Sequence, residues 1–501
     1  MAKFLSTSAT VCIAALFAGS AAHADVNAQE VWENWKAQID IYGEDGFTYA
    51  SEEYSGGTLT VSDIQISMSD EFSTFRGDLG SLVFTENGDG TVTIDIPKEM
   101  SMVIGSSEKS SGDRVVVNIS NSGTSAIASG DPDEINYQIN ADRYTIEIAE
   151  AFEDGEAIDM ELRANVNDLD FEQTVTTEGE LRDINFAGSA ASFDVFLSVL
   201  EDDENVDISG QTLGVAFSGK SVTPIDYDAT RPELMFQAGG GAQMQYSSVQ
   251  TGYLLNVTDD MGTTSIATSA TDVNAEFSVD MDHMAFSFGE SNVAISASGG
   301  QVPFPIDASI AHLGMNLEMP MSMTDEPADF ALGFDVTDFA VNDMIWMMAD
   351  PAGMLPRDPA TILVDFTGTA KLFADLFDPA QTAKLDMDEA PGELHSITLN
   401  GLNLSVAGAS ITGDGGFTFD NTDLESFDGI PRPEGEVNLE AKGINGLMDT
   451  LVEMGLIPED QIMGARFMLG MFANSVGDDH LSSKLEVNSE GHVLANGQRL
   501  Q

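Results

Sequence analysis

Short segments in which apolar and polar residues alternate run through most of this 501-residue chain. An alternation of period two predicts strands with one buried and one solvated face. In Thr58–Met68 the alternation shifts by one residue at Asp63, which predicts a β-bulge. The sequence Asn-Gly-Asp-Gly at 87–90 is typical of a hairpin turn, because glycine tolerates a positive φ. Similar alternation predicts strands at Val115–Ile119, Tyr144–Ile148, Phe277–Phe288, Phe330–Phe339, Ile362–Phe366, Ile397–Val406, Phe417–Phe419 and Val437–Leu439.

Helices are expected where apolar residues recur at spacings of three and four. Val31, Trp32, Trp35 and Ile39 give the segment 27–42 one apolar face, which predicts a helix that covers the core. A helix lying on a membrane surface is the less favoured alternative, because it would carry Lys and Arg on its polar face. Further helices are expected at Ser192–Leu200, Val341–Met348, Ala370–Phe377, Ile444–Leu456 and Glu459–Phe472.

These elements together predict a mainly β protein of the α+β class. Half-buried strands suit an antiparallel sheet, here a long twisted sheet curled into a groove, with about five short helices packed on it or capping its ends. A strand, an apolar helix and an apolar-Pro-charged-Asp segment recur around Pro356 and Pro458 as a weak repeat. We expect one β-rich half at 25–230 and a second, with the strand-helix repeats, at 231–501. Two stacked domains are the alternative to one continuous sheet.

The first 24 residues predict a secretory signal peptide. Lys3 precedes an apolar run from Ala9 to Ala18, and Ala-His-Ala at 22–24 has the small-x-small pattern of a cleavage site. The run is shorter than the roughly 20 residues that span a bilayer, and no later segment is long and apolar enough. The single cysteine, Cys12, lies within this run, so we expect a mature protein without disulfides. The predicted location is the periplasm or the extracellular medium.

Acidic residues outnumber basic ones by 84 to 19, for a net charge of −65. A surface of this charge repels phosphate groups, which excludes nucleic acid as a partner and disfavours anionic membranes. The acidic residues are scattered, so they predict solvated strand faces and turns, with no acidic tail or cage of ligands. Hydrophobic residues make up 42% of the chain, enough for a packed core, so the chain is not a disordered acidic segment.

No motif in the sequence predicts a catalytic site. GVAFSGKS at 214–221 has the spacing of a phosphate-binding loop, but its apolar residues alternate as in a strand and Pro224 stands where the helix should begin. The segment from Asp203 to Asp207 begins like an EF-hand, but Ile208 replaces the required glycine. The six histidines are dispersed, and Asp280–His283 is the densest group of metal-ligand residue types. We expect no cofactor and no metal centre, and we leave loose calcium binding at aspartate-bearing turns open.

Methionine is abundant, with 24 residues that gather in a few clusters. Thioether clusters outside the cytoplasm can hold Cu(I), but no His or Cys accompanies these closely. Flexible apolar filling, or the lining of an adaptable apolar groove, is therefore favoured. The predicted lining residues are Met315, Met319, Met321, Met323, Met344 and Met347.

Two segments carry a resemblance to a known family. DPAGMLPRDPAT at 350–361, followed by DLFDP at 375–379, and DVNAQEVWENWK at 25–36 resemble a family of secreted alphaproteobacterial proteins, the domain-of-unknown-function family numbered 2125. The likeness extends over most of the mature chain and implies no activity and no functional residues. The last third also looks distantly like AsmA-type envelope proteins, through Gly413-x-Gly415, Pro433-x-Gly435 and the apolar helix around Leu447. That likeness implies a long sheet that handles lipids in an apolar groove.

The leading functional hypothesis is an exported envelope protein that binds an apolar ligand such as lipid in a sheet-lined groove. The alternative is a non-catalytic structural or interaction protein that meets another envelope component through its sheet. A hydrolase would need a convergent Asp, Glu and His cluster, for which the sequence gives no motif.

Overall fold

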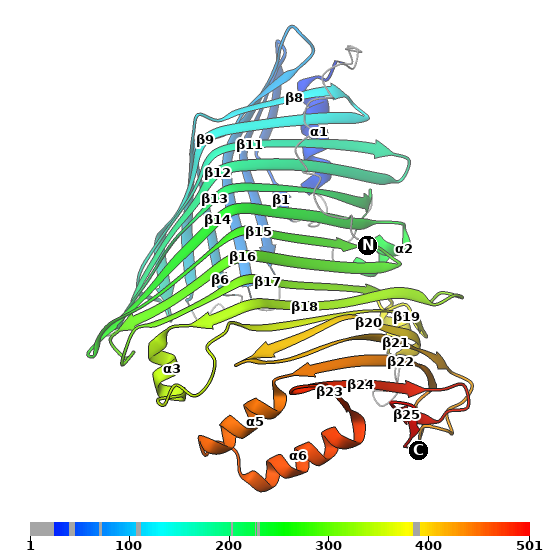
Figure 1. Cartoon of the computed structure of the whole chain (residues 1–501). Coiled ribbons are helices and arrows are strands. Elements are labelled where there is room, and N and C mark those ends of the chain that lie inside the picture. Colours follow the sequence, from blue (N-terminus) through cyan, green and yellow to red (C-terminus); the bar gives the residue numbers. More distant parts are fainter. Residues whose placement is uncertain are drawn as a thin grey trace.

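The computed structural model describes residues 25–39, 46–69, 73–106, 112–201, 204–225, 227, 231–383 and 391–500. The predicted signal peptide at 1–24 and the last part of the predicted N-terminal helix lie outside the described residues. The fold-class prediction is confirmed, because strands make up most of the described chain and belong to one large antiparallel sheet (Figure 1).

The first part of the sheet consists of short and medium strands. They are β1 (Phe47–Thr48), β2 (Ser51–Ser55), β3 (Thr58–Ser69), β4 (Ser73–Glu86), β5 (Val92–Asp95), β6 (Glu99–Ser106), β7 (Arg114–Ser122), β8 (Ser125–Asp131), β9 (Glu134–Glu153) and β10 (Glu156–Ala157). The predicted bulge at Asp63 is confirmed by its φ of 54° and by a register shift between β3 and β4. The predicted hairpin is also confirmed, because β4 and β5 pair across the turn at 87–91.

Eight long strands form the middle of the sheet, and each pairs with the next along the chain. They are β11 (Asp159–Glu178), β12 (Leu181–Glu201), β13 (Glu204–Pro224), β14 (Gly241–Asp259), β15 (Gly262–Val279), β16 (His283–Gly299), β17 (Ile306–Pro320) and β18 (Ala328–Val341). Because β13 pairs with β14 from Asn205 to Val222, the sheet runs without a break past residues 230 and 231.

The same hairpin connectivity continues to the C-terminus. The last strands are β19 (Ala360–Leu372), β20 (Gly392–Val406), β21 (Ala409–Asp420), β22 (Arg432–Lys442), β23 (Asn474–Gly477), β24 (His480–Val487), β25 (Val493–Ala495) and β26 (Gln498–Arg499). Neighbouring strands pair in chain order as far as β22, which then pairs with β24 because two helices are inserted between them. The sequence GVAFSGKS at 214–221 lies inside β13, as its alternation predicts, and this strand continues to Pro224.

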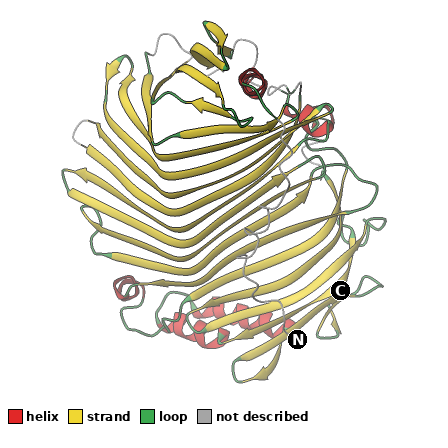
Figure 2. Ribbon diagram, turned by 90° about the horizontal axis from the view of Figure 1, so that it is seen from above, coloured by secondary structure: helices red, strands yellow, loops and turns green. Residues whose placement is uncertain are grey.

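The long strands bend along a row of positions that crosses the sheet (Figure 2). Asp168, Gly214, Asp272, Asn292 and Asp338, in five different strands, have φ between 52° and 60°. Asp, Asn and Gly are the residues that adopt this left-handed conformation most readily. The ladder pairings are interrupted at the same row, so the bend is a property of the sheet as a whole. It divides each long strand into two arms.

The helix α1 (Ala28–Ile39) packs on one arm of the first long strands and on the strands before them. Its N-terminus is fixed by Asn27, whose Oδ1 accepts hydrogen bonds from the backbone N–H groups of Gln29 and Glu30. Val31 and Trp32 of α1 are part of a buried core. The strands contribute these residues to it: Leu59, Val61, Ile64, Phe84, Val92, Ile135, Tyr137 and Val175. Its apolar face therefore covers the core, as the spacing of apolar residues predicts.

The described residues contain five further helices, each between two strands: α2 (Pro232–Gln237), α3 (Asp343–Ala349), α4 (Pro379–Thr382), α5 (Ile444–Glu453) and α6 (Glu459–Phe472). The predictions for α5 and α6 are confirmed. The helix expected at Val341–Met348 begins at Asp343, because Asn342 is its N-cap and accepts a hydrogen bond from the backbone N–H of Ile345.

Two helix predictions are wrong. Ser192–Leu200 is part of β12, where Phe193, Val195 and Leu197 share one face and pair with strands on both sides. Ala370–Phe377 comprises the end of β19 and a non-helical segment. Phe377 in that segment stacks on Phe236 of α2 with the ring centroids 4.0 Å apart, and this contact joins the segment to α2.

Candidate functional site

One face of the long strands is apolar on both sides of the bend. We call the arm that contacts α1 the near arm and the other the far arm. The strand register places these side chains on one face of the near arm: Phe186, Phe217, Met244, Phe277, Phe286 and Leu317. The corresponding side chains of the far arm are Phe193, Leu197, Ile208, Leu255, Ile266 and Ile310. An apolar face of this extent is the main chemical feature of the sheet.

The opposite face of the same strands is polar and carries much of the acidic charge. On the near arm it bears Glu172, Asn185, Lys220, Gln245, Glu276 and Asn316. Lys220 pairs there with the half-buried Asp183 at 2.6 Å. The sheet is therefore amphipathic, with its charges and amides on one side.

Burial along the bend shows that the apolar face lies on the inside of it. Ala190, Thr212, Ser248, Ala270 and Val293 flank the bend on the apolar face, and each is buried. The left-handed residues of the bend itself are exposed where they are not glycine. The inner side of a bend loses accessible surface and the outer side gains it. We therefore call the apolar side the inner face.

The inner face continues beyond the long strands. Val364 of β19 pairs with Phe334 on one side and with Leu402 on the other. At the far end of the sheet, Val437 of β22 pairs with Leu485 of β24. One apolar face thus extends from the strands under α1 to the last strands of the chain.

The helix α1 covers only the first part of the inner face. Arg182 of β12 is buried and donates a hydrogen bond from Nη1 to the carbonyl oxygen of Ala37 at 2.6 Å. Gln173 of β11 donates from Nε2 to Oε1 of Gln38 at 3.2 Å. These two hydrogen bonds fix the C-terminal half of α1 to the inner face.

Beyond α1, large apolar side chains of the inner face are open to solvent. The exposed fractions are 54% for Met244, 38% for Phe277, 41% for Met315, 49% for Leu332 and 43% for Phe334. These residues lie in β14, β15, β17 and β18, and the inner-face residues Phe286 and Phe288 of β16 lie between them, so they belong to one connected area. Contiguous apolar surface of this kind marks a site for a ligand, a partner or a membrane.

The structure divides the six predicted lining methionines among three places. Met315 and Met319 lie on the inner face in β17, opposite Phe288 and Met284 of β16. Met321 is buried just after β17, and Met323 is exposed two residues further on. Met344 and Met347 lie in α3, where both are exposed.

The sequence analysis missed most of the aromatic residues of the inner face. Phe171, Phe186 and Phe217 of three neighbouring strands contact one another with centroid distances of 6.1–6.5 Å. Their alternation with polar residues was visible in the sequence. What the sequence does not reveal is the one-residue shift at the bend, which moves the inner-face positions from even to odd numbers along β11.

Glu290 is an unusual residue of the inner face. Apart from the terminal residues of each strand, the described inner-face positions of β11–β18 carry two charged side chains, Arg182 and Glu290. Glu290 pairs with Leu313 of β17 and stands beside Val273 of β15. Burial among these apolar neighbours raises the pKa of its carboxyl group.

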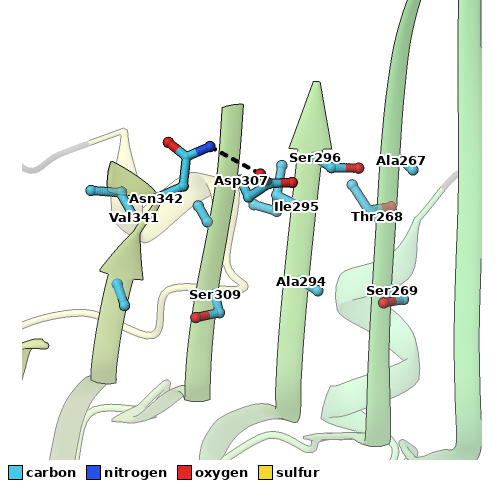
Figure 3. Close-up of a pocket in the computed structure, with 12 residues that line it drawn as sticks. Ala267, Thr268, Ser269, Ala294, Ile295, Ser296, Asp307, Ser309, Val341 and Asn342 are labelled. Atoms are coloured by element: carbon cyan, nitrogen blue, oxygen red, sulfur yellow. Dashed lines mark hydrogen bonds between the residues drawn. The ribbon is translucent and has the colours of Figure 1, made fainter. Parts of the chain in front are cut away.

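A hollow of about 510 Å³ lies on the opposite, polar face of the far arm (Figure 3). Small side chains such as Ala267, Ser269, Ala294 and Ser309 create it, because they leave space above the backbone of three adjacent strands. At its edge Asn342 Nδ2 donates to Asp307 at 2.9 Å. The hollow has no nucleophile paired with a base, so it offers no catalytic arrangement among its lining residues.

The densest group of metal-ligand residue types serves a turn. The carboxylate of Asp280 accepts hydrogen bonds from the backbone N–H groups of Asp282 and His283 at 2.8 and 2.9 Å, and lies 3.1 Å from the ring Nδ1 of His283. This arrangement closes the connection between β15 and β16. No group of three or more His, Cys, Asp and Glu side chains suited to a metal ion is found within the described residues. None of the described helices is both long and apolar enough to cross a membrane.

The fold and its inner face define a class of protein: a single bent antiparallel sheet with one apolar, partly uncovered side. Residues 255–496 match the family described as uncharacterized protein conserved in bacteria (DUF2125), and this match supports the family expected from the sequence. The match begins within β14 and includes DPAGMLPRDPAT and DLFDP, whereas the segment at 25–36 lies outside it. No curated protein matches the chain.

Proposed function

We propose that this protein is exported to the periplasm or beyond and binds a lipid or another long apolar ligand along its inner face. The observation that carries the proposal is the uncovered part of that face, from Met244 to Phe334, within an otherwise acidic protein. Leaving such side chains in water is unfavourable by about 25 cal/mol per Å², so an apolar occupant would be stabilised there. The expected likeness to AsmA-type proteins points the same way, and the geometry supports the proposal independently of it.

The length of the inner face favours an elongated ligand. Neighbouring strands are about 4.8 Å apart, so the five strands from β14 to β18 present an apolar path of about 20 Å. A hydrocarbon chain can lie along such a path and contact the aromatic and methionine side chains of each strand. Methionine suits this role because its flexible thioether adapts to ligands of different shape.

Lipid extraction and native mass spectrometry of the full chain, purified from the host with its own signal, would test the proposal. We expect a co-purifying apolar molecule, and we expect the substitution Leu332→Asp to abolish it by placing a charge on the inner face. The matched control is Thr367→Asp, because Thr367 is exposed on the polar face of the neighbouring strand β19. A wild-type protein that is reproducibly empty and fails to take up added lipid would refute the proposal.

The alternative function, a structural or interaction protein of the envelope, is favoured by α6. Met463, Phe467 and Met471 of this helix are 62%, 68% and 45% exposed, and recur at a spacing of four. A partner protein would cover these side chains. Crosslinking from α6 in intact cells would support this function by recovering one defined envelope protein, and recovery of no protein would count against it.

A further inference from the structure

Next to the bend, the inner face contains two polar side chains, Ser248 and Glu290, that lie in one row across the sheet. Ser248 of β14 pairs with Val273 of β15, and Val273 stands next to Glu290 of β16. Leu313 of β17 follows Glu290 in the same row. Ser248 and Glu290 are thus separated by one apolar residue and two strand spacings, about 10 Å.

Ser248 is buried, with 4% of its surface exposed, and its Oγ has no hydrogen-bond partner among the described residues. A hydroxyl group that is buried without a partner is unfavourable and unusual in a folded protein. On the other side of the bend, the hydroxyl of Thr212 lies 3.2 Å from those of Thr251 and Tyr253, so that group is satisfied internally. Among the described residues of this row, Ser248 therefore has a hydroxyl group that the protein itself leaves without a partner.

We propose that Ser248 and Glu290 form a polar anchor for the uncharged hydroxyl-bearing end of an otherwise apolar ligand, such as a long-chain alcohol or a monoacylglycerol. This inference rests on the proposed function, because it assumes that the inner face holds an apolar chain. A ligand hydroxyl can donate a hydrogen bond to the carboxyl group of Glu290 or exchange one with Ser248. The row places both groups beside the aromatic and methionine side chains that would contact the hydrocarbon.

The same anchor disfavours fatty acids. A ligand carboxylate near Glu290 would place two like charges in an apolar setting, where their repulsion is weakly screened. Arg182, the other charged side chain among the described inner-face positions of β11–β18, is engaged with the carbonyl oxygen of Ala37 near the end of α1. The neighbours that face Glu290 from β15 and β17, Val273 and Leu313, carry no charge to compensate a ligand anion.

The test compares ligands of equal chain length on the full chain at about pH 7.5. A neutral apolar dye, N-phenyl-1-naphthylamine, is bound and then displaced by 1-dodecanol or by dodecanoate. We expect the alcohol to bind about tenfold more tightly than the acid, which corresponds to one hydrogen bond to a charged group. Glu290→Gln should reduce this preference to less than about threefold by strengthening dodecanoate binding, and Ser248→Ala should weaken the alcohol several-fold.

The control variant is Glu276→Gln, which removes an exposed acid from the polar face of β15 and should leave both affinities unchanged. Equal binding of alcohol and acid by the wild type, unchanged in Glu290→Gln, would overturn the anchor while leaving apolar binding intact. Failure of the dye and of both ligands to bind would overturn the proposed function itself. The two failures are therefore distinguishable.

Discussion

Trp32 holds α1 against the inner face, and replacing it with alanine should release the helix. The indole ring is 1% exposed and lies 5.7, 5.7 and 5.8 Å from the ring centroids of Phe47, Tyr49 and Phe84. Its Nε1 donates a hydrogen bond to Oε1 of Glu52 at 2.6 Å. The substitution Trp32→Ala removes all of these contacts at once.

The expected loss is large compared with the stability of the helix. Burial of about 200 Å² of indole surface at about 25 cal/mol per Å² corresponds to about 5 kcal/mol, and removal of large aromatic residues from cores costs about 3–5 kcal/mol. A 12-residue helix is marginal in water by itself, so α1 depends on this packing. A loss of about 3 kcal/mol raises the undocked population by about 150-fold.

Hydrogen exchange measured by mass spectrometry on the full chain would check this expectation. The amides of residues 31–39 should lose about two orders of magnitude of protection in Trp32→Ala, whereas those of β20–β22 should keep theirs. The control Gln29→Ala changes an exposed residue on the solvent side of α1 and should behave like the wild type. Unchanged protection of α1 in Trp32→Ala would refute the reasoning that this side chain secures the helix.

Three further outcomes follow from the bend, the inner face and the C-terminal strands, each measured by urea unfolding. Asp272→Val places a β-branched residue at a φ of 52° and should destabilise by about 1–2 kcal/mol, while Asp272→Gly should be near neutral; equal stability would contradict the account of the bend. Because burial raises the pKa of Glu290, the folded state holds that proton more tightly than the unfolded state, so ionisation destabilises the fold as the pH rises above the ordinary value of 4.5. Glu290→Gln should therefore stabilise at about pH 7.5 and have no effect at about pH 3.5, and a gain of the same size at both values would argue against it. Gly415→Ala should destabilise by about 2 kcal/mol or more, because its φ is 152° and an added Cβ would overlap the carbonyl oxygen of Glu436, whereas Gly464→Ala in the open face of α6 should stabilise by about 0.5–1 kcal/mol.

Local sequence patterns predicted elements where a single rule decides the structure. Glu459–Phe472 is helical because its apolar residues recur at helical spacing after Pro458, which begins the helix as its N-cap. The hairpin at 87–90 follows from its glycines. Ser192–Leu200 was misread because Phe196 and Leu200 add apolar residues on the solvated side and hide the alternation.

The predicted lining methionines do not share one surface. Met315 and Met319 do lie on the inner face, but Met344 and Met347 lie in α3, because a cluster along the sequence does not fix a shared face in space. Glu290 and Ser248 had no motif to mark them. Their role depends on neighbours in other strands, which only the register brings together.

The sequence by itself determined that this chain forms an acidic, mainly β protein with amphipathic strands, because alternation along a strand is a local property of residue order. Only the tertiary structure decided that the apolar sides of these strands join into one inner face. That outcome requires the left-handed residues of several strands to align in one row, and alignment between strands is set by pairing across the whole sheet. The same pairing leaves part of the inner face beyond the reach of α1, and there the proposed function lies.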